Sequence, residues 1–299
     1  MKIVVTGSSG LVGSALVPHL RAAGHETLRL VRGRPLEAGE LSWDPRGFKV
    51  DAAVFDGVSA VIHLAGAPIA EGRWTAARKE LIRQSRVDST RFLARTLADL
   101  PTPPRVFVSA SATGFYGDRG EEELDETSAV GVGFLSEVCR QWEAAAAAAS
   151  AAGIRVVHPR IGMVLARGGG ALAKMLMPFR LGAGAALGSG RQWTSFVHLG
   201  DLLRLLEFAL TNSELAGPVN AVSPAPLRQA EFAATLAAAV GRKARLKAPG
   251  WALEALFGEM AEELLLASAK VLPRRLLAAG FTFDHPDLES ALRDILADS

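Results

Sequence analysis

Three glycines near the start of the chain have the spacing of a phosphate-binding turn. Gly7, Gly10 and Gly13 stand three residues apart, after a short β-branched run and at the beginning of an amphipathic segment. Glycine lets the backbone adopt a positive φ and approach a pyrophosphate, and the amides of the following helix face that anion with the helix dipole behind them. The pattern predicts a dinucleotide site formed by Gly7, Gly10, Leu11, Val12 and Gly13. The alternative is a tight strand-to-helix turn that binds no ligand.

The end of the second apolar run indicates which dinucleotide binds. An acid at this position hydrogen-bonds the ribose 2′-hydroxyl of NAD, whereas an arginine suits the 2′-phosphate of NADP. Val31 is followed here by Arg32 and Arg34, and the first acid after them is Glu37. Two guanidinium groups therefore stand where a phosphate would gain from them. The sequence predicts NADP, with Val31 and Arg32 in its site. In the alternative interpretation, both arginines are solvated loop charges.

A third apolar run ends in small residues, which a backbone needs where it lies against the adenosine ribose or the pyrophosphate. Leu64, Ala65 and Gly66 follow His63 at the end of this run. We therefore include Leu64, Ala65 and Gly66 in the predicted cofactor site. His63 itself lies inside the apolar run. A core histidine bonded to the backbone is the favoured interpretation, and a catalytic histidine is the alternative.

A parallel sheet is needed to bring these segments together. Strand-like runs alternate with helical patterns in the first half of the chain, and this alternation indicates βαβ units. The runs are almost entirely apolar, as expected of strands that are buried on both faces. The predicted strands are Lys2–Thr6, Glu26–Val31, Ala60–Leu64, Arg105–Ser109 and Ile154–Pro159, and the clearest helices are Leu11–Ala23, Thr75–Leu100 and Leu135–Ala152.

We predict an α/β fold, a doubly wound parallel sheet of the Rossmann type with a smaller C-terminal lobe. Residues 1–165 form the predicted NADP-binding domain, and residues 195–222 return to it. The segment 166–194 is rich in glycine, which is typical of tightly turning loops. Together with 223–299, whose last part is helical, it forms the predicted lobe on the substrate side.

The composition excludes several other classes of protein. The chain has 33 Lys and Arg against 31 Asp and Glu, a balance that offers no basic surface for nucleic acid. A single cysteine, Cys139, rules out an intrachain disulfide framework and a multi-cysteine metal site, and we predict no metal. No apolar run reaches about 18 residues, and the apolar start is too short for a signal peptide. We therefore expect a cytoplasmic protein that does not span a membrane.

With these elements the chain resembles the extended short-chain dehydrogenase/reductases, the superfamily of nucleotide-sugar epimerases and dehydratases. Further motifs resemble one atypical branch, the epimerase-family NADP-binding oxidoreductases. These motifs are Arg73-Trp74-Thr75, Ser85-Arg86, Gly168-Gly169-Gly170, Leu187-Gly188-Ser189-Gly190-Arg191-Gln192-Trp193, Phe196-Val197-His198 and, near the C-terminus, Gly258-Glu259-Met260. The resemblance covers nearly the whole chain. It implies a Rossmann fold, bound NADP and oxidoreductase chemistry on a small molecule.

The chain departs from the superfamily at its acid/base pair. The resemblance implies a tyrosine followed four residues later by a lysine, which lowers the pKa of the phenol so that it exchanges a proton near neutral pH. The single tyrosine is Tyr116, and Gly120 stands four residues after it. Comparison with the superfamily puts Leu135 and Cys139 at the positions of the pair. We expect Cys139 to be a buried, inert thiol.

A hydroxyl-bearing stretch remains where the superfamily has its catalytic serine or threonine. It leaves the fourth predicted strand, and ligands of a doubly wound sheet lie at the carboxyl ends of its strands. The resemblance puts Ser111 or Thr113 at the hydroxyl position. Tyr116 is a candidate surrogate proton donor, although a tyrosine-glycine pair at this place is commonly not catalytic in the resembled superfamily. Ser111, Thr113 and Tyr116 are therefore the candidate catalytic residues. A structural or substrate-contact role is the alternative for Tyr116.

The resemblance adds two further residues to the cofactor site. Lys79 and Arg86 lie seven residues apart on one helix, on the face that approaches the cofactor in the resembled branch. We prefer Arg86 because a guanidinium binds a phosphate through two hydrogen bonds. Ile161 follows the fifth strand, where such folds cover the nicotinamide. Solvated helix charges are the alternative for Lys79 and Arg86.

A glycine loop further on offers a second open choice. Arg191 and Trp193 follow its glycines, and His198 comes soon after. These side chains form either a wall of the substrate pocket, with Arg191 offered to an anionic group, or a structural cluster in which Trp193 belongs to the core and His198 contacts the turn at Asp201.

Three functions fit these residues. The favoured one is an NADP(H)-dependent oxidoreductase that acts on a small or nucleotide-linked carbonyl or alcohol, because the hydroxyl stretch and the glycine loop are retained. The second is a non-catalytic NADP(H)-sensing protein, which the missing tyrosine–lysine pair favours. The third is a nucleotide-sugar epimerase or dehydratase that uses its cofactor as a transient hydride store, and the missing pair argues against it. The expected partner is a small-molecule substrate, and a homodimer is left open.

Overall fold

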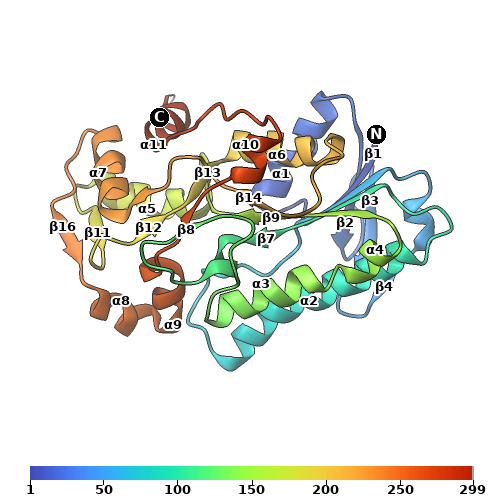
Figure 1. The fold of residues 1–299 in the computed structure, drawn as a ribbon, viewed down its shortest axis with the longest axis horizontal. Coiled ribbons are helices and arrows are strands. Elements are labelled where there is room, and N and C mark those ends of the chain that lie inside the picture. Colours follow the sequence, from blue (N-terminus) through green and yellow to red (C-terminus); the bar gives the residue numbers. More distant parts are fainter. Residues whose placement is uncertain (298–299) are drawn as a thin grey trace.

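The computed structural model describes residues 1–297 and is built around one large sheet (Figure 1). The strands of this sheet are β1 (Lys2–Thr6), β2 (Glu26–Arg32), β3 (Glu40–Asp44), β4 (Lys49–Val50), β5 (Ala60–His63), β6 (Val106–Ser109), β7 (Ser111–Ala112), β9 (Arg155–Ile161) and β14 (Gly217–Ala221). They are arranged in the order β14-β9-β6-β5-β1-β2-β3-β4, and β7 pairs with β9 beside this path. Neighbouring strands are parallel, apart from the antiparallel pair of β3 and β4.

Helices cover both faces of this sheet. Successive residues of a strand point to opposite faces, so each strand contributes side chains to the core on either side. The helices beside it are α1 (Leu11–Ala22), α2 (Ala76–Ala98), α3 (Phe134–Ala144), α4 (Ala147–Ala151) and α6 (Leu199–Thr211). In β1, Ile3 belongs to the core shared with α1 and α6, whereas Val4 belongs to the core shared with α2 and α4. Two buried faces explain the apolar strands, and the predicted doubly wound α/β fold is confirmed.

A smaller lobe lies beyond one end of the sheet, on the left of Figure 1. Its main elements are α5 (Gly170–Arg180), β11 (Ala185–Leu187), α7 (Gln229–Ala239), β16 (Leu246–Ala248), α8 (Gly250–Phe257) and α9 (Glu259–Ala261). It has its own core, in which Phe179 and Phe232 meet Leu292 of α11 (Leu288–Leu296). The division of the chain into the two predicted parts stays a prediction.

The remaining elements of the described chain are short. They are η1 (Ala52–Phe55), η2 (Thr113–Tyr116), β8 (Glu123–Leu124), β10 (Met163–Leu165), β12 (Trp193–Thr194), β13 (Phe196–His198), β15 (Leu227–Arg228), η3 (Glu262–Leu266), β17 (Lys270–Val271) and α10 (Arg274–Ala278). Among the residues of the described chain, no helix is long and apolar enough to cross a membrane.

Several elements differ from the sequence-based expectation, and strand β3, which pairs with β2, was not predicted. The helix predicted over Leu135–Ala152 is interrupted between α3 and α4, where Ala146 N–H bonds the carbonyl oxygen of Glu143, three residues back. Strand β14 was not predicted, because Pro218 interrupts a short apolar run. As an edge strand that pairs with β9, β14 tolerates a proline, which has no N–H to donate.

Candidate cofactor and active site

The glycine turn between β1 and α1 is packed so closely that side chains do not fit in it. Gly7 has φ +71°, and a Cβ atom added there would lie 2.7 Å from the carbonyl carbon of Leu64. A Cβ atom added to Gly13 would lie 2.2 Å from the carbonyl oxygen of Gly7. Gly10 caps α1 without a side-chain hydrogen bond, so the amides of the first turn, at Leu11 and after it, stay available to an anion.

Two arginines at the end of β2 have no acidic partner in the described part of the chain. Arg32 and Arg34 are exposed, and within residues 1–297 neither forms an ion pair. The first acid after them, Glu37, accepts a hydrogen bond of 2.7 Å from Arg29 Nη2 instead. Two uncompensated cations therefore flank the end of β2, next to the glycine turn that follows the neighbouring strand β1.

His63 at the end of β5 is a core residue. Its ring is fully buried, with Nδ1 2.6 Å from Thr6 Oγ1 and Nε2 3.2 Å from Ser89 Oγ. Burial lowers the pKa of His63 to about 3, so the ring is neutral at physiological pH. The geometry supports the interpretation of His63 as a core residue, although its partners are hydroxyl groups and not the expected backbone.

The other predicted cofactor residues gather around the carboxyl end of β5. The backbone of Leu64 and Ala65 touches the glycine turn at Gly7. A Cβ atom added to Gly66 would lie 3.1 Å from Cζ of Arg86. Ile161, at the end of β9, packs with Leu64 against a small cluster that includes Trp142. Segments far apart in the sequence thus meet at one edge of the sheet. Their assignment to a cofactor stays a prediction.

The three candidate hydroxyl groups lie in different environments. Ser111 is buried, and its Oγ donates a hydrogen bond of 2.7 Å to Glu143 Oε1. Thr113 is partly exposed, and its hydroxyl has no hydrogen-bond partner among residues 1–297. The phenol of Tyr116 is fully buried.

The Tyr116 hydroxyl forms hydrogen bonds with three groups of the protein. Its proton faces Asn220 Oδ1 at 2.6 Å and the carbonyl oxygen of Asp125 at 2.9 Å, and it accepts a hydrogen bond of 3.0 Å from Arg160 Nη1. Burial raises the pKa of Tyr116 to about 12, although Arg160 opposes this shift. This environment favours a structural role. A role of Tyr116 as proton donor stays a prediction that the geometry does not support.

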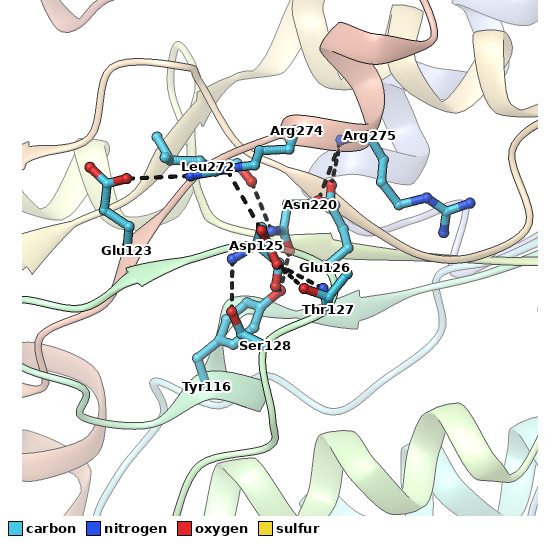
Figure 2. A network of polar contacts seen from close by, with 10 residues as sticks. All are labelled: Tyr116, Glu123, Asp125, Glu126, Thr127, Ser128, Asn220, Leu272, Arg274 and Arg275. Carbon is cyan, nitrogen blue, oxygen red and sulfur yellow. Dashed lines mark hydrogen bonds and ion pairs between the residues drawn. The ribbon is translucent and has the colours of Figure 1, made fainter.

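Figure 2 shows that the same network fastens the C-terminal part of the chain to the sheet. Asn220 Nδ2 donates a hydrogen bond of 2.9 Å to the carbonyl oxygen of Leu272. The buried carboxylate of Glu126 accepts hydrogen bonds from the backbone amides of Asn220, at 3.0 Å, and Arg275, at 3.3 Å. Burial raises the pKa of Glu126, although the backbone hydrogen bonds and the charge of Arg275 oppose this shift.

Glu143 and Arg160 are site residues that the sequence analysis missed. Arg160 Nε and Nη2 bond the two carboxylate oxygens of Glu143 at 2.8 and 2.9 Å, and the guanidinium lies 3.4 Å from the centre of the Phe115 ring. Burial opposes the charge of Arg160, but the hydrogen bonds to Glu143 raise its pKa above the usual value. One signal was present, because Glu143 follows Cys139 by four residues and so shares its helix face.

The positions of the missing acid/base pair face the hydroxyl stretch. A Cβ atom added to Gly114 would lie 3.2 Å from Cβ of Leu135 and 3.9 Å from Sγ of Cys139. Burial raises the pKa of the Cys139 thiol to about 12, which makes it inert as a nucleophile. Apolar and unreactive groups thus occupy the helix face that the resembled superfamily uses for proton transfer.

The C-terminal segment covers the start of α3. Glu263 of η3 accepts hydrogen bonds of 2.7 Å from the amides of both Phe134 and Leu135. Lys79 Nζ forms an ion pair of 2.7 Å with Glu259, and this ion pair joins α2 to α9. The two contacts seat the C-terminal segment beside the candidate active site.

The contacts of His198 favour a structural role for this residue. His198 Nδ1 accepts a hydrogen bond of 3.1 Å from the amide of Gly200, at the start of α6. Its Nε2 is 3.2 Å from Asp294 Oδ2, and the ring of His285 lies 4.0 Å away. A metal would need the lone pair of Nε2, but the bond from Gly200 leaves the proton on that atom. This group is therefore a hydrogen-bonded clamp between α6 and α11.

Trp193 lies at the surface of the lobe. Its Nε1 donates a hydrogen bond of 3.1 Å to Glu121, and the Arg228 guanidinium lies 4.2 Å from the centre of its ring. Nothing in these contacts places Arg191 or Trp193 beside the hydroxyl stretch, and their role in a substrate pocket stays a prediction.

A parallel sheet with a glycine turn at the end of its first strand defines a Rossmann-type nucleotide-binding protein. Comparison with protein families is more specific. Residues 3–222 match the NAD dependent epimerase/dehydratase family, and residues 248–295 match a domain of unknown function, DUF1731. The chain belongs to the NAD dependent epimerase/dehydratase family.

Curated relatives are similar over their full lengths. Epimerase family protein MT2273 of Mycobacterium tuberculosis is 42% identical over 97% of this chain and 96% of its own length. Human epimerase family protein SDR39U1 is 37% identical over 99% of this chain and 100% of its own length. These relatives confirm the resemblance to the atypical epimerase-family branch.

Solved structures share the fold. The crystal structure of human epimerase family protein SDR39U1 (isoform2) with NADPH has a TM-score of 0.90 and 35% identity, and the match covers 100% of both chains. A nucleoside-diphosphate sugar epimerase from Corynebacterium glutamicum has a TM-score of 0.83 and 37% identity, over 99% of this chain and 58% of that one. MoeE5 in complex with UDP-glucuronic acid and NAD, at 19% identity and a TM-score of 0.78, shares the fold alone.

Proposed function

We propose that this chain is an NADPH-dependent oxidoreductase of the atypical extended short-chain dehydrogenase type. The observation that carries the proposal is the pair of uncompensated cations, Arg32 and Arg34, at the end of β2, since a 2′-phosphate distinguishes NADPH from NADH. The glycine turn accommodates a pyrophosphate where no Cβ atom fits. The human relative of known structure was crystallised with NADPH, which supports the same choice.

NADPH supplies a hydride, and the residues of the chain prepare the carbonyl that receives it. We place Thr113 next to the carbonyl oxygen, because its hydroxyl is accessible and has no partner among residues 1–297. A hydrogen bond from this hydroxyl stabilises the negative charge that develops on the oxygen. The carbon gains the hydride, and the oxygen takes its proton from solvent. Ser111 acts through Glu143 as a positioning residue, because its proton is already donated.

A single titration series tests the proposal. NADPH and NADH are titrated by following nicotinamide fluorescence, and carbonyl compounds, including nucleotide-linked sugars, are then added to the NADPH complex. Tight NADPH binding, weaker NADH binding and oxidation of NADPH by any carbonyl would support the enzyme. An equal affinity for both dinucleotides would remove the 2′-phosphate site from the end of β2.

A binding protein that senses NADP(H) is the second candidate, and one observation favours it. The only tyrosine is held in the core, and the positions of the acid/base pair carry Leu135 and Cys139. Tight NADPH binding without turnover across a broad carbonyl panel would favour the sensor over the enzyme. An epimerase or dehydratase would need the same acid/base pair, so we rank it below both.

A further inference from the structure

Arg86 is a cation with spare hydrogen-bond donors in the middle of the candidate site. Its Nη1 donates to the carbonyl oxygen of Ile82 at 3.2 Å and lies 3.5 Å from Ser85 Oγ. Within residues 1–297, no carboxylate pairs with this guanidinium, and Nε and Nη2 have no acceptor. Two other cations of α2 are paired, Lys79 with Glu259 and Arg83 with Glu80.

The surroundings of Arg86 place its charge next to α3. One side of the guanidinium faces the backbone of Gly66, and its Cζ lies 5.2 Å from the centre of the Trp142 ring. Trp142 follows Cys139 by three residues, so the two side chains share a helix face. Burial lowers the pKa of Arg86 to about 10, the cost of holding a cation with no counter-ion in this position.

The chain therefore carries a cation beside the position where the resembled superfamily has its lysine. Cys139 occupies that position and approaches Gly114 of the hydroxyl stretch. Burial raises the pKa of the Cys139 thiol, and the positive charge of Arg86 opposes this shift. Arg86 of α2 therefore supplies a positive charge beside Cys139, where α3 carries no lysine.

We propose that Arg86 replaces the missing lysine and binds the nicotinamide-ribose half of NADPH. This inference rests on the proposed function and assigns one part of its site. The amides of α1 already serve the pyrophosphate, and Arg32 and Arg34 serve the 2′-phosphate, so the two halves of the cofactor have separate cations. The free Nε and Nη2 donors of Arg86 suit the oxygen acceptors of the nicotinamide ribose and of the phosphate attached to it.

The test separates the two halves of the cofactor by ligand. Calorimetry compares NADPH with adenosine 2′,5′-bisphosphate, which lacks the nicotinamide ribose and the second pyrophosphate phosphorus. We expect R86M to weaken NADPH binding about 10- to 100-fold, as when donors to a polar ligand are lost, and to leave adenosine 2′,5′-bisphosphate unchanged. R86K retains the charge and should fall between R86M and the wild type. The control R83M removes a paired cation of the same helix and should bind like the wild type.

Each other outcome has one meaning. Unchanged NADPH affinity in R86M would overturn the inference. An equal loss for both ligands, in a variant whose unfolding temperature is preserved, would move Arg86 to the adenosine half and also overturn it. A wild-type chain that binds neither ligand would instead overturn the proposed function.

A second experiment introduces a lysine at position 139 of α3. In the R86M background, C139K should recover part of the lost NADPH affinity, because the lysine then occupies the superfamily position. In the wild-type background, C139K puts two cations side by side and should lower the unfolding temperature. A folded R86M/C139K variant that recovers no affinity would contradict the equivalence of the two cations. Should the double variant fail to fold, the affinity of R86K relative to R86M decides whether the charge is what matters.

Discussion

The hydroxyl groups of Ser111, Thr113 and Tyr116 belong to one short stretch, yet their environments give them separate roles. Ser111 orients Glu143, Tyr116 holds Asn220 and Arg160, and the hydroxyl of Thr113 is bonded to no residue of 1–297. The residue types identify all three as candidates, because each carries an O–H group. Only burial and hydrogen bonding separate the free hydroxyl from the committed ones. Of the three residues, we therefore propose Thr113 as the one that contacts a substrate.

Tyr116→Phe tests the structural role of the phenol. Removal of the hydroxyl leaves Asn220 Oδ1 and Arg160 Nη1 each one partner short inside the core. We expect the free energy of unfolding to fall by about 1–3 kcal/mol, while NADPH affinity stays unchanged. Chemical denaturation and NADPH titration measure the two quantities. A variant of wild-type stability that has lost all reductase activity would instead make Tyr116 the proton donor.

Arg32→Asp tests the choice of dinucleotide. The substitution replaces an exposed cation at the end of β2 with the acid that suits a ribose 2′-hydroxyl. NADPH affinity should drop about 10- to 100-fold, and NADH affinity should change much less. Arg245→Asp, which makes the same change at an exposed position of the smaller lobe, is the matched control. A preference equal to that of the wild type would exclude Arg32 from the 2′-phosphate site.

Helix α3 shows how one element combines two functions. Leu135 and Cys139 face the hydroxyl stretch, and one turn later Glu143 binds Arg160 of β9. Its first amides are capped by Glu263, which comes from the far end of the chain. Helical periodicity predicts that Leu135, Cys139 and Glu143 share a face. It contains no information about Arg160 or Glu263, because both contacts join segments that are distant in sequence.

Glu143→Gln tests the ion pair that joins α3 to β9. The substitution leaves the buried guanidinium of Arg160 without its counter-ion, which costs about 3–5 kcal/mol of the free energy of unfolding. The double variant E143Q/R160M should lose less than E143Q alone, because no uncompensated charge remains. Glu137→Gln, on the exposed face of the same helix, is the control and should change stability little. Denaturant midpoints measure the stability of each variant. An equal loss of stability in E143Q and E137Q would rule out a structural role for the ion pair.

Over the whole molecule, the first three predicted strands agree with β1, β2 and β5 to within one residue at each end. Strands buried on both faces leave continuous apolar runs, which a sequence shows directly. Strand β14 escaped prediction because its proline weakens the local pattern, and its place depends on pairing with β9. The glycine turn could also be predicted, because its motif lies within one short segment. The partners of Tyr116 could not be predicted, because Asn220 lies 104 positions further along the chain.

The free energy of unfolding should depend on pH partly through the titration of His63. Burial lowers its pKa to about 3, against about 6.5 in the unfolded chain, so the unfolded chain binds more protons between these values. Its contribution to stability is complete above pH 6.5 and is lost as the pH falls toward 3. In His63→Gln, the slope of unfolding free energy against pH should be smaller in this window by about 1.4 kcal/mol per unit. Parallel slopes for the two proteins would mean that His63 is accessible to protons in the native state.

The hydrogen bonds that tie Tyr116 to Asn220, and Asn220 to Leu272, also set an order of events during synthesis. The hydroxyl stretch leaves the ribosome early, but the residues that seal it follow about 100 and about 150 positions later. At about 5–20 residues per second, the nascent chain waits on the order of 5–30 s with this part of its core open to water. A chaperone that shields apolar surface can bind this part of the chain during that interval.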